Sequence, residues 1–216
     1  MTSRDAILQR VRSALAGSSP VAPPPVAEVW PRENPDAATM AGRFSQELAD
    51  VQGEVIRSAT IEEAGRHLAD LVGQAQWTAL GLMDRPLVRE LAASLPPDLA
   101  AWAAADWQPG RMAELSASVV EAELLLADTG SSLIACPTAQ DRLLCYLPPA
   151  CVVVAKVERL REHLPAAWPA IAPGVADPAR RGEFVIVTGP SRTADIEKIL
   201  ILGVHGPKRL VVLLIG

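Results

Sequence analysis

Long aliphatic runs in the second half of the chain indicate strands that are buried on both faces. Strands are predicted over 151–157, 183–188 and 209–215, which contain CVVVAKV, FVIVT and LVVLLI. A strand with one wet face alternates apolar and polar positions, whereas strands of a parallel sheet covered by helices stay apolar throughout. We therefore predict a mostly parallel sheet flanked by helices, with helices near 158–164 and 194–202 between these strands.

The first half alternates helical and strand patterns, as βα units do. Thr60 followed by Glu63 has the spacing of a capping box, and Pro86 suits the first turn of another helix. No element is predicted for 96–110, where prolines and tryptophans interrupt the pattern. The predicted elements are a helix over 37–51, a strand over 54–58, a helix after Thr60, a strand over 77–83 and a helix near Pro86.

A short antiparallel pair is predicted within this fold. The stretches 124–127 and 131–136 are strand-like, and only Asp128, Thr129 and Gly130 lie between them. A connection this short is typical of a hairpin. The predicted fold class is therefore α/β, a mostly parallel sheet flanked by helices with an antiparallel hairpin.

An N-terminal appendage over 1–36 precedes the predicted α/β domain over 37–216. Residues 3–16 have apolar side chains at helical spacing and predict an amphipathic helix. Six prolines between Pro20 and Pro35 favour an extended, semi-rigid linker. Two alternatives stay open, because the helix packs either on its own domain or on a partner.

Composition and charge exclude several classes of protein. The 216 residues include five Trp, two Phe and one Tyr, too few for a platform that stacks single-stranded nucleic acid. A net charge of −5 argues against a surface for duplex phosphates. The charged N-terminal segment and the lack of a long apolar run predict a cytoplasmic protein without a signal peptide or membrane span.

The three cysteines lack the spacing of a metal site. Cys136, Cys145 and Cys151 form no C-x-x-C pair, so we expect neither a metal nor an iron–sulfur cluster on this chain. We interpret them as reduced, packed thiols. The sequence also lacks the G-x-S-x-G, P-loop and G-x-G-x-x-G motifs, which removes the usual support for hydrolase and nucleotide-binding functions.

Two polar segments directly follow predicted strands, where ligands bind in open α/β sheets. In the first, Asp128 and the hydroxyls after it follow LLLA, and Gly130 can bring backbone N–H groups close to an anionic or hydroxylated ligand. The alternative is a tight turn without a ligand, in which Asp128 accepts from its own downstream backbone.

The second segment runs from Thr188 to Asp195, before the predicted helix. Arg192 and the free N–H groups of that helix start would hold a carboxylate. Asp195 and Glu197 in the first turn would repel a dianionic phosphate. The alternative is that Ser191 or Thr193 merely caps the helix.

A third candidate is His205, which lies between Gly203 and Gly206 before the last predicted strand. Its imidazole suits a general acid or base or a contact with a partner, and the alternative is a helix C-cap. Arg142 is a weak candidate for closing over Asp128. We expect the other two histidines, His67 and His163, to be solvated.

Taken together, ADTGSS, LLCYLPPACVVVAKV, TGPSRTADIEKILILGVHGPKRL and the closing VVLLI resemble the LUD-domain family, in particular its lactate utilization protein C group. The resemblance is strongest over 119–216. It implies a fold similar to the NagB/RpiA/CoA transferase-like group. The positions that carry the motifs are Asp128, Thr129, Gly130, Thr188, Gly189, Pro190, Ser191, Arg192, Thr193, Asp195, Glu197, His205 and Gly206.

The resemblance also implies a role in oxidising L-lactate to pyruvate, with iron–sulfur clusters on partner subunits. The leading hypothesis is an accessory subunit without a redox centre that binds a small hydroxy- or keto-acid or a partner near Asp128, Arg192 and His205. One alternative is a stand-alone transferase or isomerase for a phosphorylated or CoA-linked molecule. Another is an assembly module that docks through its N-terminal helix.

Overall fold

The structure is a computed structural model that describes residues 2–17, 30–177, 184–193, 201–202 and 206–216. It divides into two compact units, Met1–Pro31 and Arg32–Gly216. In the first unit, helix α1 (Ser3–Leu15) begins at a capping box formed by Thr2 and Asp5, and its apolar stripe is exposed at Ile7, Leu8, Val11 and Leu15. The predicted amphipathic helix is confirmed, and its docking surface stays a prediction.

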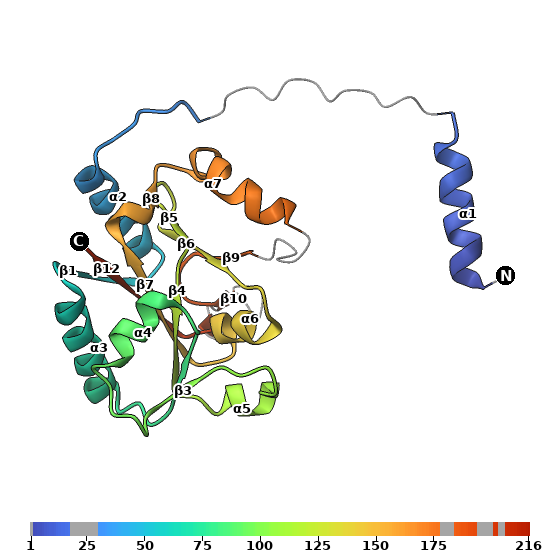
Figure 1. Cartoon of the computed structure of the whole chain (residues 1–216). Helices are drawn as coiled ribbons and strands as arrows, with labels where there is room; N and C mark the ends of the chain where they lie inside the picture. Colours follow the sequence, from blue (N-terminus) through green and yellow to red (C-terminus); the bar gives the residue numbers. More distant parts are fainter. Residues whose placement is uncertain (1, 18–29, 178–183, 194–200, 203–205) are drawn as a thin grey trace. The chain divides into compact units, whose positions relative to one another are not determined.

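The second unit is built on a parallel six-stranded sheet (Figure 1). Every neighbouring pair in this sheet is parallel. The mostly parallel sheet predicted from the aliphatic runs is therefore confirmed. In spatial order the strands are β1 (Glu54–Ser58), β12 (Arg209–Ile215), β7 (Ala150–Lys156), β4 (Ala117–Glu121), β2 (Leu80–Leu82) and β3 (Ala100–Trp102).

Alternate positions on the central strands pack into two different cores. Val152, Val154 and Leu213 belong to one core, and Val153 and Val212 belong to the other. Helices α3 (Ile61–Ala75) and α4 (Pro86–Ala92) cover the first face of the sheet. Helices α2 (Ala37–Asp50), α5 (Pro109–Ala113) and α6 (Ala139–Tyr146), together with a second sheet, cover the other face. Both faces are thus buried, which is why these strands carry no polar alternation.

The second sheet contains the predicted hairpin. Its spatial order is β8 (Leu160–Arg161), β5 (Leu124–Leu126), β6 (Ser131–Ala135) and β9 (Phe184–Val187). The β5–β6 pair is antiparallel, as predicted from the short connection. Helix α7 (Leu164–Ala176) covers the outer face of this sheet through Ala167 and Ile171.

Two predictions about the segments around α7 are wrong. The range 158–164 is not one α-helix, because a 3-10 helix over Val157–Arg159 leads into the short strand β8 and α7 starts only at Leu164. The run FVIVT is not a parallel strand buried on both faces. Strand β9 pairs antiparallel with β6 at the margin of the second sheet, and Ile186 is 48% exposed.

The helix predicted near 194–202 is also wrong at its end. Ile201–Leu202 forms strand β11, which pairs antiparallel with β10 (Arg192–Thr193). Residues 194–200 lie outside the described part of the chain. Over the residues described, no helix is both long and apolar enough to cross a membrane.

Candidate functional site

The order of the parallel strands creates one crevice at the carboxyl edge of the sheet. After β2, the chain passes through α4 to β3, which lies on one side of β2. After β4, the next strand of this sheet is β7, which lies on the other side of β4. In open α/β sheets, ligands bind where successive connections leave in opposite directions, outside the carboxyl ends of the strands. The residues at this point are Asp84 and Arg85 after β2, and Glu121 at the end of β4.

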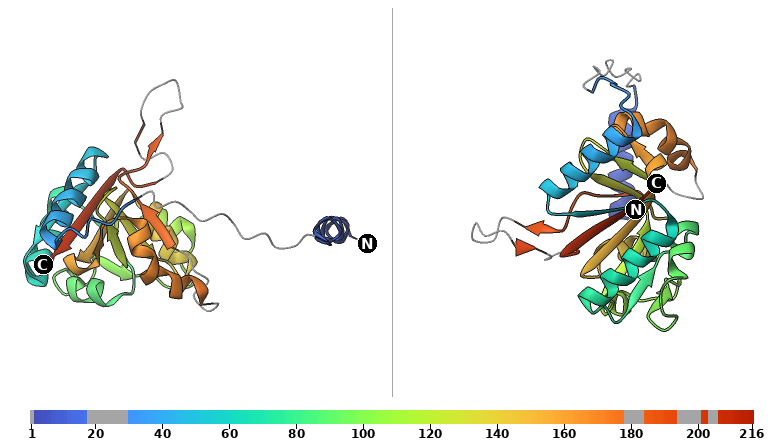
Figure 2. Two further views of the ribbon diagram at one scale, coloured as in Figure 1. Left: turned by 90° about the horizontal axis from the view of Figure 1, so that it is seen from above. Right: turned by 90° about the vertical axis from the view of Figure 1, so that its left-hand side faces the viewer.

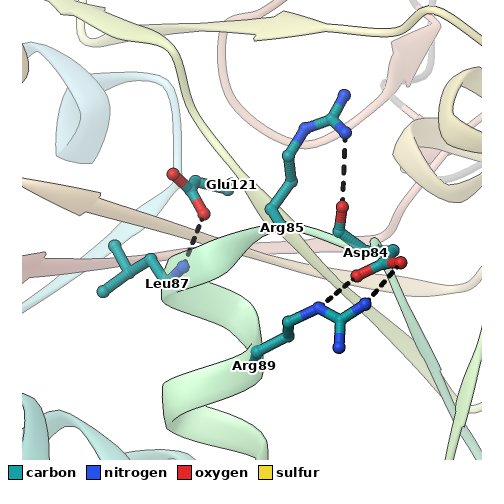
Figure 3. A network of polar contacts seen from close by, with 5 residues as sticks. All are labelled: Asp84, Arg85, Leu87, Arg89 and Glu121. Carbon is teal, nitrogen blue, oxygen red and sulfur yellow. Dashed lines mark hydrogen bonds and ion pairs between the residues drawn. The ribbon is translucent and has the colours of Figure 1, made fainter.

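Charged side chains at this point are held by backbone hydrogen bonds and by one ion pair (Figure 3). One carboxylate oxygen of Glu121 accepts the backbone N–H of Leu87 at 2.9 Å. Leu87 lies in the first turn of α4, where a backbone N–H has no carbonyl partner within the helix. Asp84 forms a two-point ion pair with Arg89 at 2.5 and 2.8 Å. The Arg85 guanidinium donates to the carbonyls of Asp84 and Ala135, both at 3.3 Å.

A cleft of about 410 Å³ opens beside this network. We call it the carboxyl-edge cleft, and its charged lining residues are Glu90, Glu121, Lys156, Glu158, Arg159 and Arg161. Arg159 is paired with Glu123, with 3.5 Å between guanidinium and carboxylate. Arg161 donates to the carbonyls of Glu158 and Leu160 at 2.9 and 2.6 Å. The volume of the cleft lies within the range of ordinary small-molecule sites, about 300–1,000 Å³.

A smaller hollow of about 210 Å³ lies on the other side of the same crevice. Arg85 and the first turn of α6 line it. That turn carries a capping box, in which the Thr138 hydroxyl accepts the Asp141 N–H at 3.0 Å and the Asp141 carboxylate accepts the Thr138 N–H at 3.3 Å. The larger cleft is therefore the better candidate for a ligand.

The structure brings the first and second sequence motifs together in a chain of hydroxyls. The Thr129 hydroxyl donates to the Asp128 carboxylate at 3.3 Å and lies 2.7 Å from the Ser131 hydroxyl. Ser131 in turn lies 2.6 Å from the Thr188 hydroxyl, across the β6–β9 pair. These side chains satisfy one another, and any role for them in ligand binding stays a prediction.

Two motif glycines are explained by close packing against the end of α2. Gly130 has a φ of +63°, and a Cβ there would lie 2.4 Å from the backbone nitrogen of Leu48. Gly189 has a φ of +78°, and its Cβ would lie 2.9 Å from the carbonyl oxygen of Val51. Both positions require glycine for the fold itself.

The third motif lies beside the second. The Ser191 backbone N–H donates to the Pro207 carbonyl at 2.8 Å, and a Cβ on Gly206 would meet the Ser191 side chain at 3.0 Å. Arg192 is exposed on β10, which pairs with β11, and the two strands project beyond the amino end of β12 (Figure 2). Thr193 is also in β10, and the expectation that Ser191 or Thr193 caps a helix over 194–202 falls on residues that the structure does not describe.

The positions of Asp195, Glu197 and His205 also lie outside the described residues. The described motif residues pack against the last turn of α2 and the segment before β12. Both of these segments lie at the amino edge of the parallel sheet. The expectation that they follow strands at its carboxyl edge is therefore not met. The reason is that β5, β6 and β9 belong to the second sheet, whose strand ends do not coincide with those of the first.

Sequence reasoning missed Asp84, Arg85, Glu121 and Lys156. Three of them carry a usable signal, because each charged residue directly follows an apolar stretch: LGLM before Asp84, ASVV before Glu121 and CVVVA before Lys156. Their proximity depends on the strand order, which the sequence does not reveal. Arg142 lies on α6 and is half-buried.

The three cysteines are all buried, as packed thiols should be. Burial raises the pKa of Cys151 to about 12. The sulfurs of Cys136 and Cys145 lie 3.9 Å apart, and this contact together with burial raises the pKa of the Cys145 thiol. Over the described residues, no three Cys, His, Asp or Glu side chains are grouped as metal ligands.

The expectation of two solvated histidines is wrong. His163 is buried at the start of α7, where its Nδ1 accepts the Ala166 N–H at 3.1 Å and its Nε2 has no hydrogen bond. His67 is half-buried, and its Nδ1 lies 2.9 Å from the Ser58 hydroxyl. A helical pattern with charged neighbours does not reveal such local partners.

Comparisons with known proteins agree on one family. Lactate utilization protein C of Bacillus pumilus is 35% identical over 107 residues, which cover 49% of this chain and 45% of that protein. The uncharacterized protein YkgG of Escherichia coli is 32% identical over 121 residues, 50% of this chain and 51% of that one. The matched region thus spans about half the length of these relatives.

The fold also matches a solved structure. A DUF162 family protein from Deinococcus radiodurans aligns with a TM-score of 0.62 at 16% identity, covering 84% of this chain and 99% of that one. The family model of the LUD domain matches residues 41–215, which include the six-stranded sheet, the second sheet and the carboxyl-edge cleft. The chain therefore belongs to the LUD domain family.

Proposed function

We propose that this chain is a subunit, without a redox centre of its own, of a cytoplasmic iron–sulfur-dependent system that oxidises L-lactate to pyruvate. The observation that carries the proposal is the LUD domain over 41–215 together with relatives named for lactate utilization. Membership in a fold family does not by itself determine chemistry, so the sites of this chain decide what it contributes.

The arrangement of the cysteines supports a contribution other than electron transfer. All three thiols are packed in the interior: Cys151 in β7, Cys145 on α6 and Cys136 after β6. Iron–sulfur clusters are held by cysteine thiolates, and this chain exposes no cysteine to hold one at its surface. The clusters of the proposed system therefore belong to partner subunits.

The test is growth of a deletion strain on L-lactate and on glucose, with other routes of lactate oxidation removed. We expect loss of growth on lactate alone, and rescue by the wild-type gene. Complementation with Lys156→Gln tests the carboxyl-edge cleft, and Lys208→Gln, an exposed lysine before β12, is the matched control. Normal growth of the deletion strain on lactate would refute the proposed function.

The purified chain provides a second test. It should show no visible absorbance from a cluster and no lactate oxidation, because the redox chemistry belongs to the partners. Lactate oxidation by the isolated chain would contradict its assignment as an accessory subunit.

A further inference from the structure

Two cations of the carboxyl-edge cleft, Lys156 and Arg161, have no carboxylate within ion-pair distance among the described residues. Lys156 ends β7 and lines the cleft, and within the described part of the chain no carboxylate lies within ion-pair distance of it. Arg159 is engaged by Glu123, and Arg161 by two backbone carbonyls. Lys156 is therefore the group most ready to bind an anion.

A carboxylate faces the same space from the neighbouring strand. In the β4–β7 register, Glu121 pairs with Val154, and Lys156 is two positions further along β7. Because strand side chains alternate between faces, Glu121 and Lys156 lie on the same face of the sheet, next to α4. One oxygen of Glu121 is fixed by the Leu87 N–H, and the other has no hydrogen bond from the described residues (Figure 3).

The balance of charge restricts the ligand. The cleft is lined by three carboxylates and three cations, so its formal charge is zero. A phosphate dianion would leave the cleft with a net charge of −2, whereas a carboxylate monoanion would leave it with −1. A monoanion that also carries a hydrogen-bond donor satisfies both Lys156 and Glu121.

We infer that the carboxyl-edge cleft binds a small 2-hydroxy acid, with its carboxylate on the Lys156 ammonium and its hydroxyl donating to the free oxygen of Glu121. This inference rests on the proposed function for the choice of L-lactate as the first ligand to test. It also disfavours the transferase or isomerase alternative, because a phosphorylated or CoA-linked molecule brings at least a dianion to a cleft whose formal charge is zero.

The test is ligand-dependent thermal stabilisation of the full chain, since a ligand that binds only the folded state raises the midpoint with concentration. The panel contains L-lactate, propionate without the hydroxyl, L-lactamide without the charge, inorganic phosphate and coenzyme A. We expect saturable binding of L-lactate that is stronger than binding of any other member. Tighter binding of phosphate or coenzyme A would overturn the inference.

Two variants locate the binding. Lys156→Gln should weaken L-lactate binding about tenfold or more, as for loss of a charge-assisted hydrogen bond, and Lys208→Gln should leave it unchanged. Glu121→Gln keeps an oxygen for the Leu87 N–H, and it should reduce the preference for lactate over propionate within the same protein. Unchanged binding in Lys156→Gln would overturn the site.

Failure of the inference and failure of the proposed function give different results. If the deletion strain loses growth on lactate but binding is absent or independent of Lys156, the function stands and the site is wrong. If L-lactate binds through Lys156 but the deletion strain grows normally on lactate, the site stands and the function is wrong.

Discussion

Gly130 offers a sharp test of how the first sequence motif is held. The residue has a φ of +63°, and a non-glycine residue in this left-handed region costs about 1–2 kcal/mol. The added Cβ would also lie 2.4 Å from the nitrogen and 2.7 Å from the Cα of Leu48, which are backbone atoms of α2. The helix would have to move by about 1 Å to reach ordinary contact, and such overpacking typically costs about 1–3 kcal/mol.

We therefore expect Gly130→Ala to lower the free energy of unfolding by about 2–5 kcal/mol, a large part of the roughly 5–15 kcal/mol of a typical domain. The assay is urea unfolding followed by circular dichroism, where the midpoint should fall by about 1 M or more at unchanged slope. The matched control is Gly42→Ala in α2, where a Cβ meets nothing within 4 Å. This control should gain up to about 1 kcal/mol from helix propensity.

The reasoning fails if the midpoint of Gly130→Ala lies within about 0.3 M of the wild-type midpoint, which corresponds to about 0.3–0.9 kcal/mol at ordinary slopes. The result also decides how growth experiments are interpreted. A loss of lactate growth in Gly130→Ala would reflect unfolding, and only variants such as Lys156→Gln report on a ligand.

Three further predictions follow from buried or paired groups. Burial raises the pKa of Cys151 from 9.0 to about 12, so the unfolded chain loses the thiol proton at a lower pH than the folded chain. The free energy of unfolding, measured with urea, should therefore fall between about pH 9 and 12, and Cys151→Ala should make this fall shallower. Glu162→Ala should lower the free energy of unfolding by about 1–3 kcal/mol, because the buried carboxylate accepts the N–H groups of Glu33 and Asn34 at 2.8 and 3.3 Å. An unchanged urea midpoint would contradict this prediction. The hydrogen bond from Arg209 lowers the pKa of Glu54, so the ion pair contributes its full stability above about pH 4.5 and loses it as the pH falls through the folded-state pKa. Arg209→Gln should therefore lower the free energy of unfolding by at most about 1 kcal/mol at pH 7 and by less in acid, which urea unfolding at two pH values measures.

The parts of the fold that could be predicted are those whose burial is complete. Strands β7 and β12 are apolar at nearly every position because both faces contact helices or the second sheet. The β5–β6 hairpin could be predicted because only three residues connect its strands. In both cases the local sequence contains all the information that the inference needs.

The parts that could not be predicted depend on contacts between distant segments. The run FVIVT has the same aliphatic character as LVVLLI, yet β9 pairs antiparallel with β6 and leaves Ile186 exposed. Helix α7 continues through Pro169 and Pro173, which ordinarily argue against a helix interior. Local composition does not show which strand a segment pairs with.

The candidate site shows the same limit. Glu121 and Lys156 are 35 positions apart in the sequence and become neighbours only through the β4–β7 register. Hydroxyl contacts join the motif residues around Asp128 and Thr188, and their role as a ligand site stays a prediction. The edge of the sheet at which they gather depends on the second sheet, which the sequence did not separate from the first.

The position of β12 between β1 and β7 has a consequence for synthesis of the protein. Strand β1 finds its only partner in the described sheet when Arg209–Ile215 arrives, about 155 residues later. During translation, β1 and one side of β7 are therefore open strand edges with apolar faces, which is the kind of surface that chaperones recognise and that aggregates. Until β12 leaves the ribosome, β1 and β7 each lack this neighbouring strand, so we expect slow or stalled translation before residue 209 to favour misfolding.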